Sequence, residues 1–302
     1  MGLLRPRARS VEPQFLCRAY LGPHFQGVIR GKTVSGTVNR IPIAEMGSWP
    51  INLPSVSEQH RLNGFFHTLD ALIAANQRKC DLLKRLKQGY LQKLFPAPGE
   101  TVPRLRFLGF NDTWEQRKLG DLATLRRGLT YKPSDVRDEG IRVLRSSNIN
   151  EDTFVLREDD VFVRSGAVNI DLVGDGDILI TSANGSSRLV GKHAIVDKLP
   201  GQAAHGGFML LASAERPEFV NALMSAPWYE SFINSNIAGG NGAIGNLSKT
   251  DLEEQKVAAP SSTEQTCIGD FFHFIDRLIT LHQQKCDQLQ DLKRAYLQKM
   301  FV

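Results

Sequence analysis

Two stretches of the chain carry apolar residues at alternating spacings of three and four positions. This is the heptad pattern of a long helix that packs against other helices, and it covers residues 55–96 and 261–302. Pro96 ends the first pattern, because proline cannot continue a helix. At about 1.5 Å per residue, each stretch forms a rod of roughly 55–60 Å. The positions predicted to pack along the two helices are Phe66, Leu69, Ile73, Cys80, Leu83, Tyr90 and Leu94, and Phe272, Ile275, Ile279, Cys286, Leu289, Tyr296 and Met300.

The two helical stretches are copies of one another. Residues 54–95 return at 260–301 without a gap, and about half of the aligned positions are identical. Asn76 and His282 are polar residues at matching positions of the two seams. Because a polar residue in an apolar seam restricts which pairings are stable, we expect these two to fix the register of the helices.

Residues 114–260 alternate short β-like runs with polar turns, which is the pattern of an α+β domain. Near its end, a helix is predicted at 216–236 and a short helix at 249–254, followed by an extended segment. Prolines and glycines make 97–113 a predicted linker. The β-like runs are Arg142–Leu144, Val161–Val163, Asp177–Thr181, His193–Val196 and Phe208–Leu211.

Residues 1–54 repeat, in a weaker form, the order of elements that precedes the second long helix. A helical segment at 15–25 is followed by a glycine-containing segment and an extended one. We therefore interpret 1–54 as the C-terminal part of a first domain whose complete counterpart is 114–260. We expect the N-terminal part of that first domain to be missing.

Composition and charge limit the classes of protein. The 302 residues are 41% hydrophobic and 23% charged, which is typical of a soluble globular protein. No apolar run approaches the ~20 residues of a membrane span, and the first residues lack an export signal, so we expect a cytoplasmic protein without a membrane partner. Four cysteines in no metal-binding spacing argue against a zinc site. The net charge of +5 permits a polyanionic partner without establishing one.

Several peptides, taken in order, resemble the specificity subunit of type I restriction-modification systems. They are VPRLRFLGF at 102–110, WEQRKLGDLATLRRG at 114–128, GDILITSANGSSRLVGKHAIVD at 176–197, the glycine-rich GGNGAIGN at 239–246, and the P-x-x-x-E-Q start of the second long helix, which ends YLQKMF. Each motif alone is weak evidence for this resemblance. Their order, together with the duplicated helix, is specific to that family.

The resemblance implies an α+β chain: an α/β DNA target-recognition domain plus two long spacer helices packed as an antiparallel coiled coil. In that family the helices separate two recognition domains, set the spacing of a split DNA target and dock two methyltransferase subunits, which the restriction subunit joins. The resemblance also implies that this chain is a non-catalytic subunit whose partners are double-stranded DNA, the methyltransferase subunits and, through them, the restriction subunit. S-adenosylmethionine for adenine methylation, ATP and Mg are expected on the partner subunits, with no cofactor on this chain.

The shortened first domain leaves several interpretations open. The chain is an inactive truncated product, a partial subunit that pairs with another specificity chain, or a cassette that donates its second domain. A purely structural coiled-coil adaptor, whose middle domain binds protein, is the alternative from another class. An enzyme acting alone is a distant third, because no catalytic motif is present, and the GxGxxG match at 240–245 lacks the preceding strand of a dinucleotide site.

DNA recognition needs cations and hydrogen-bonding groups on irregular segments that reach phosphates and base edges. Four segments of 114–260 supply such groups, and a solvated loop is the alternative for each. The candidate DNA-contacting residues are Arg126, Arg127, Thr130, Tyr131 and Lys132; Arg145, Ser146, Ser147 and Asn148; Asn184, Ser186, Ser187 and Arg188; and Asn241 and Asn246 in the glycine-rich loop.

Overall fold

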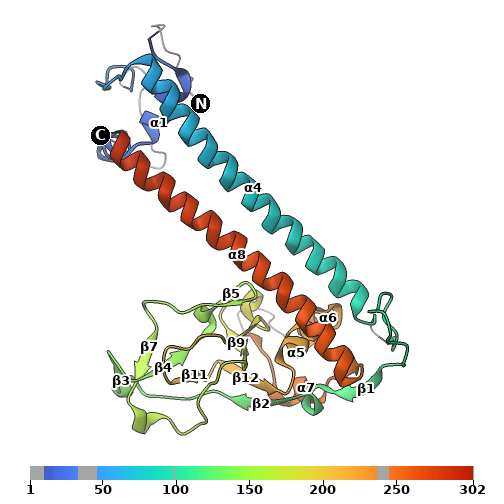
Figure 1. Cartoon of the computed structure of the whole chain (residues 1–302). Helices are drawn as coiled ribbons and strands as arrows, with labels where there is room; N and C mark the ends of the chain where they lie inside the picture. The colour runs from blue at the N-terminus through green and yellow to red at the C-terminus, as the bar shows by residue number, and fades with distance from the viewer. Residues whose placement is uncertain (1–9, 33–45, 98, 237–244, 302) are drawn as a thin grey trace. The chain divides into compact units, whose positions relative to one another are not determined.

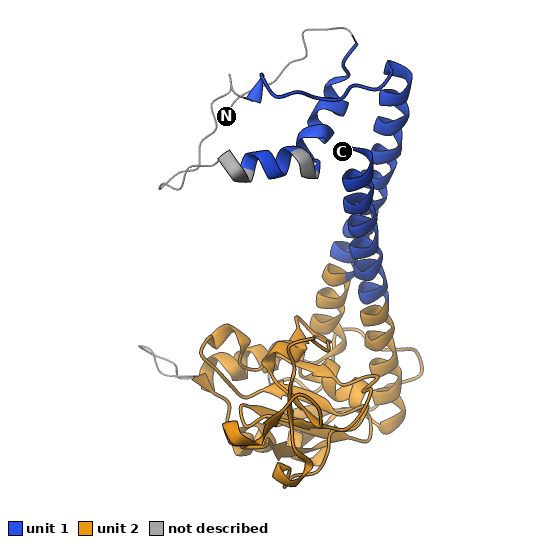
Figure 2. Cartoon of the chain, turned by 90° about the vertical axis from the view of Figure 1, so that its left-hand side faces the viewer, with its two compact units in different colours: residues 1–83, 278–302 blue, residues 84–277 orange. Residues whose placement is uncertain are grey.

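The chain forms two compact units in a computed structural model (Figure 2). Unit 1 contains residues 1–83 and 278–302, and unit 2 contains 84–277. This division cuts across the predicted domain boundaries, because each long helix contributes to both units. The structure describes residues 10–32, 46–97, 99–236 and 245–301.

Both predicted long helices are present (Figure 1). Helix α4 spans Val56–Leu94 and α8 spans Ser262–Met300, each with 39 residues. The Ser55 hydroxyl accepts a hydrogen bond from the Glu58 amide at 3.3 Å and so caps the start of α4. Together with the sheets of unit 2, these helices confirm the mixed α+β fold class.

In unit 1 the two helices run antiparallel, and equivalent residues of the repeat meet. The Nδ1 atom of His282 lies 2.9 Å from Oδ1 of Asn76. The Asn76 amide group also donates to the Leu72 carbonyl oxygen of its own helix at 2.9 Å. Because the bond between the two side chains forms only when Asn76 and His282 lie opposite one another, it favours this register of the helices, as the sequence indicates.

The contacts on either side of this pair are reciprocal. The Cys80 thiol lies 3.4 Å from the carbonyl oxygen of Ile279, and the equivalent Cys286 thiol lies 3.6 Å from that of Ile73. Both cysteines are buried and free, so they act as small packing residues. The middle of the helix pair in unit 1 therefore has local two-fold symmetry.

Charged residues of the repeat make the same pair in each unit. In unit 1 the Lys293 ammonium lies 2.6 Å from the Asp70 carboxylate, and in unit 2 the equivalent Lys87 lies 2.7 Å from Asp276. Burial raises the pKa of the Asp276 carboxyl. Lys87 is nearly buried at a seam position, and its pairing with this carboxylate offsets part of the cost of burying it.

Most of the residues predicted to pack along the helices are buried or half-buried. The packing prediction for Met300 is wrong, because its side chain is 41% exposed while the next residue, Phe301, is buried. Its repeat equivalent Leu94 is buried because it packs in the same cluster as Trp114 and Leu119 of unit 2. The cluster around Phe301 in unit 1 does not include Met300.

Unit 1 also contains two short helices within residues 10–32. Helix α1 spans Pro13–Leu21 and α2 spans Pro23–Lys32. The Phe15 ring of α1 lies 5.2 Å from that of Phe301, which in turn lies 5.9 Å from Phe66 of α4. These aromatic contacts hold α1 against the paired long helices.

Two four-stranded sheets form the centre of unit 2. The first is antiparallel in the order β10-β8-β12-β2, and the second has the order β11-β4-β7-β3, in which only the β11–β4 pairing is parallel. Mainly antiparallel pairing makes α+β a better description of this domain than α/β. The strands are β2 (Ala123–Arg127), β3 (Val136–Arg137), β4 (Ile141–Leu144), β7 (Val161–Val163), β8 (Ile178–Thr181), β10 (His193–Ile195), β11 (Ala203–His205) and β12 (Met209–Ala214).

Three short strand pairs and several 3-10 turns of the described residues lie outside these sheets. The pairs are β1 (Glu115–Lys118) with β14 (Lys256–Ala259), β5 (Ile149–Asn150) with β6 (Thr153–Phe154), and β9 (Ala183–Asn184) with β13 (Gly245–Asn246), all antiparallel. The 3-10 turns are Leu119–Asp121, Pro133–Asp135, Ser146–Asn148, Ser165–Ala167 and Ser187–Leu189.

The predicted helix at 216–236 is two helices. Helix α5 spans Pro217–Leu223 and α6 spans Pro227–Asn236. Pro227 has no amide hydrogen to continue the first helix, but its fixed backbone angle suits the first turn of a new one. The predicted short helix matches α7 (Lys249–Glu254), and Ser248 caps it by accepting from the Asp251 amide at 3.3 Å.

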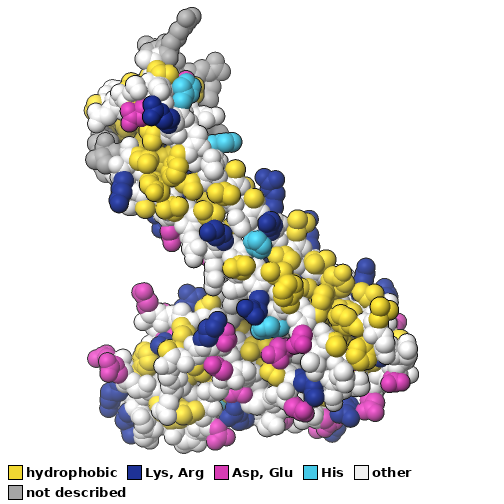
Figure 3. Space-filling model, in the orientation of Figure 1, with side chains coloured by type: hydrophobic (Ala, Val, Ile, Leu, Met, Phe, Trp, Pro, Cys, Tyr) yellow, Lys and Arg dark blue, Asp and Glu magenta, His cyan; other side chains and the backbone are white. Residues whose placement is uncertain are grey.

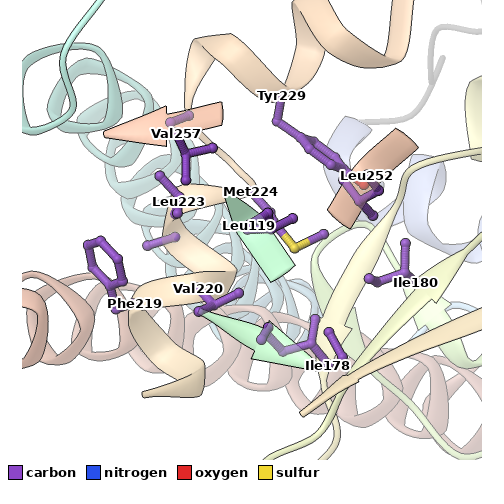
Figure 4. Packing of buried hydrophobic residues seen from close by; sticks show 14 of the residues in the cluster. Leu119, Ile178, Ile180, Phe219, Val220, Leu223, Met224, Tyr229, Leu252 and Val257 are labelled. Atoms are coloured by element: carbon purple, nitrogen blue, oxygen red, sulfur yellow. The ribbon is translucent and has the colours of Figure 1, made fainter. Parts of the chain in front are cut away.

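The main core of unit 2 lies between α5–α7 and the first sheet (Figure 4). Ile178 and Ile180 of β8 face Val220 and Met224 of the α5 region, and all four are buried. The start of α8 joins this core, since Phe272 lies 5.9 Å from Phe95 between ring centres. The core therefore fixes the first sheet to a rigid helical base.

Two helical glycines of unit 2 should respond oppositely to alanine. At Gly89 an added methyl group meets no atom within 4 Å, so Gly89→Ala should stabilise the helix by about 0.5–1 kcal/mol. At Gly269 it would lie 2.7 Å from the Phe219 amide nitrogen, so Gly269→Ala should destabilise by about 1–3 kcal/mol. Urea unfolding followed by circular dichroism measures both, and equal shifts for the two variants would contradict this packing.

Candidate nucleic-acid interface

An open groove of about 560 Å³ lies where the end of β2, the turn between β11 and β12 and the segment before α7 meet. Ser182 and Ala183, at the start of β9, form a fourth part of its walls. The polar residues that line it are Arg127, Thr130, Ser182, Asn246, Ser248 and Lys249.

Glycine allows the two sheets to meet beneath this groove. A methyl group on Gly128 would overlap the carbonyl oxygen of Gly206, so only glycine permits the two backbones to come this close. The next residue, Leu129, donates its amide to the His205 carbonyl oxygen at 2.7 Å and forms a parallel bridge with Gly206. The end of β2 is thereby tied to the β11–β12 turn.

Three of the predicted contact residues lie together in the groove. Arg127, Thr130 and Asn246 are all exposed. Within the described ranges, their side chains have no hydrogen-bond or ion-pair partner. Their donors and acceptors are therefore available to a ligand, in contrast to Lys249, whose ammonium lies 2.8 Å from Glu253.

Arg126 has a different role from its neighbour. Successive strand residues point to opposite faces, so Arg126 and Arg127 diverge. The Arg126 guanidinium donates to Asp177 at 3.1 Å and to the Ser213 hydroxyl at 3.0 Å. The side chain is thus held in a structural network, which makes it a poor candidate for a DNA contact.

The contact prediction for Asn148 is wrong, because the residue is fully buried. Its side-chain oxygen accepts from the Arg145 amide at 2.8 Å, and its amide group donates to Asp160 at 2.8 Å and to the Val155 carbonyl at 3.0 Å. The Arg145 guanidinium also donates to the Asp159 carbonyl oxygen at 3.0 Å. These residues hold the loop in shape.

Two of the predicted segments come together. The Asn184 amide group donates to the Ser146 hydroxyl at 3.0 Å, and its oxygen accepts from the Ser186 amide at 2.9 Å. Because Asn184 pairs with Gly245 in the β9–β13 ladder, this cluster continues to the groove residue Asn246. Ser147 lies in the same loop as Ser146, but its hydroxyl oxygen is buried.

The remaining predicted residues lie at the periphery. Ser187 and Arg188 are exposed in a 3-10 turn, and Lys132 is exposed after β2. Tyr131 is half-buried against the second sheet. Asn241 lies outside the described residues.

A buried histidine, His205, lies at the same junction between β2 and β11. Burial lowers the pKa of the His205 imidazole, so the ring is neutral at physiological pH. Its Nε2 atom lies 3.3 Å from the Arg126 carbonyl oxygen. A neutral donor there connects β11 with β2 without placing a charge in the interior.

Phe208 and Lys249 line the groove but were not singled out by the sequence patterns. Phe208 begins a predicted strand run, and Lys249 begins a predicted helix, so both looked like ordinary members of those elements. The Gly206–Gly207 pair before Phe208 was the available signal, because paired glycines mark a turn.

No group of three or more His, Cys, Asp or Glu side chains among the described residues could hold a metal ion. Within the same residues, no helix combines the length and apolar character that a membrane span requires.

The chain is similar to a known protein family and to two curated proteins. Residues 111–291 match the family model of the type I restriction modification DNA specificity domain. The StySPI type I restriction enzyme specificity subunit of Salmonella potsdam is 25% identical over 197 residues, covering 63% of this chain and 42% of that protein. The EcoKI specificity subunit of Escherichia coli (strain K12) is 23% identical over 316 residues, covering 99% of this chain and 67% of that protein.

A solved structure shares the fold. The S subunit of a type I restriction-modification system from M. genitalium has a TM-score of 0.64 and 15% identity, covering 97% of this chain and 73% of that one. The chain therefore matches from 42% to 67% of the lengths of the two curated relatives.

Proposed function

This chain belongs to the family of the type I restriction modification DNA specificity domain, and on this basis we propose that residues 114–260 recognise one half of a split DNA target. The groove that exposes Arg127, Thr130 and Asn246 without internal partners carries the proposal. A free guanidinium suits a phosphate or a guanine edge, and hydroxyl and amide groups suit base edges. The chain itself performs no catalysis in this proposal.

The long helices are proposed to recruit methyltransferase subunits. Figure 3 shows exposed hydrophobic side chains along them, and covering this apolar surface with a partner would be favourable. Leu86 and Leu292 occupy equivalent positions of the repeat and are 46% and 42% exposed. The same apolar side chain presented by each copy suits two copies of one partner. S-adenosylmethionine, ATP and Mg would bind those partners, and the restriction subunit would join through them.

Residues 1–54 are proposed to be the end of a first recognition domain. Helices α1 and α2 begin at Pro13 and Pro23, with the same separation as the prolines that begin α5 and α6. Phe15 packs on Phe301 in unit 1, as Phe219 packs on Phe95 in unit 2. This equivalence of sequence and contact supports the interpretation, and it leaves open pairing with another specificity chain.

Selection from a random duplex library tests the DNA proposal. The full chain, assembled with its methyltransferase subunit, should enrich one half-site motif, and its affinity should fall steeply as salt rises because counterions return to the phosphates. Equal retention of all duplexes would contradict sequence reading. If no duplex is retained, the alternative of a coiled-coil adaptor whose middle domain binds protein would be favoured.

Arg127→Ala should weaken duplex binding while leaving the methyltransferase interaction unchanged. If Arg127 pairs with a guanine, the binding free energy should fall by about 1–3 kcal/mol for the cognate duplex alone. If it contacts a phosphate, binding to all duplexes should weaken, and the slope of log affinity against log salt concentration should become shallower by about 1. Titration at several salt concentrations distinguishes the two. Lys198→Ala, which removes an exposed cation that does not line the groove, is the matched control and should have no effect.

A further inference from the structure

We propose that Phe208 reads a thymine of the half-site through contact with its C5 methyl group. The proposal rests on the DNA recognition proposed above and adds to it a specificity-determining residue. Thymine is the base that presents an apolar group in the major groove, and phenylalanine is one of the side chains that contact it there.

The first observation is the exposure of the ring. Phe208 is 70% exposed, whereas the following residues of β12, Met209 to Ala212, are buried. A large apolar side chain in this position does not contribute to the core. Phe208 also lines the groove, so its exposed surface lies where the ligand is proposed to bind.

The second observation is that the backbone under the ring is fixed. The Phe208 carbonyl oxygen accepts from the Ser182 amide at 2.9 Å and from the Ala183 amide at 3.1 Å. The Met209 amide donates to the Gly206 carbonyl oxygen at 2.8 Å. The ring is therefore presented by a rigid turn, which lowers the entropy lost when it makes a contact.

The third observation is the chemistry around the ring. Thr130 and Asn246 line the same groove with free hydrogen-bonding groups, and Arg127 supplies a cation. A thymine–adenine pair presents a methyl group beside the O4 acceptor of thymine and the N6 donor and N7 acceptor of adenine. One apolar side chain among polar donors and acceptors matches this edge, whereas a docking site for an apolar protein segment would continue as apolar surface.

Deoxyuridine substitution tests the contact directly, because it removes only the methyl group. The full chain with its methyltransferase subunit first selects its half-site, and each thymine of that site is then replaced singly by deoxyuridine. One replacement should weaken wild-type binding about fourfold, the effect of roughly one buried methyl group. In Phe208→Ala the same replacement should have no effect, and in Phe208→Leu, which keeps an apolar contact, part of the effect should return.

The outcomes separate this inference from the wider proposal. If no half-site is selected, the proposed function fails. If a half-site is selected but no thymine methyl group matters, or if Phe208→Ala remains sensitive to its loss, DNA recognition stands and the role of Phe208 is overturned. Equal weakening of all duplexes by Phe208→Ala would also overturn it, since that result would indicate a ring inserted between bases without reading them. Binding to the methyltransferase subunit is the control for folding.

Discussion

Arg106→Ala should lower the free energy of unfolding by about 3–5 kcal/mol, because it leaves a buried carboxylate without a partner. Arg106 comes from the predicted linker, and its guanidinium donates two hydrogen bonds to Glu264, at 2.9 and 2.7 Å. The Glu264 side chain is only 1% exposed, so water cannot replace the lost pair. Urea midpoints followed by tryptophan fluorescence measure the change.

Three variants control this experiment. Arg104→Ala removes an exposed arginine two residues away and should change stability by less than about 0.5 kcal/mol. Glu58→Ala truncates the exposed repeat equivalent of Glu264 and should be equally mild. Replacing both members of the pair, with Arg106→Met and Glu264→Leu, should recover most of the loss. An Arg106→Ala protein as stable as the double variant would mean that the carboxylate reaches solvent.

The repeat illustrates how far sequence reasoning extends. Heptad spacing placed both long helices within two residues of their ends, because a helix of this length is determined by a periodic signal over many turns. The same comparison treats Glu58 and Glu264 as equivalent. They differ because segment 97–113 packs against the second copy through Arg106, and no local pattern specifies that tertiary contact.

The candidate site shows the same limit. Residue type and loop position selected Arg127, Thr130 and Asn246, which lie in one groove, but they also selected Arg126 and Asn148, whose side chains are held by Asp177 and Asp160. A polar side chain in a loop either faces solvent or satisfies the interior, and its sequence neighbours do not distinguish the two. Only the fold identifies the partners.

Phe208 and Lys249 were missed for the opposite reason. Lys249 begins α7, and Phe208 lies in the turn before β12 but begins a predicted strand run, so both sequence patterns are explained without a ligand. They reach the groove because β2, β9, β12 and α7 converge, and that convergence depends on the close approach of two backbones at Gly128. The position of this glycine is therefore the point at which the fold determines the shape of the proposed reading surface.

Gly128→Ala should consequently damage both stability and DNA binding. The added methyl group would overlap the Gly206 carbonyl oxygen, and neither atom can move without shifting a backbone. Separating the strands would weaken the bond between the Leu129 amide and the His205 carbonyl oxygen, so we expect a loss of about 1–3 kcal/mol in the free energy of unfolding. Arg127 would move relative to Phe208 across the groove.

Duplex affinity should therefore fall roughly tenfold or more in Gly128→Ala, equivalent to at least about 1.4 kcal/mol, even below the temperature at which the variant unfolds. The measurement is titration of the selected half-site duplex at 10 °C, with circular dichroism to establish that the variant is folded. Gly201→Ala is the matched control, because an added methyl group there meets no atom within 4 Å and the residue does not line the groove, and it should bind as the wild type does. If Gly128→Ala is folded and binds normally, the groove is not the surface that contacts DNA, since its two walls could then move apart without consequence for recognition.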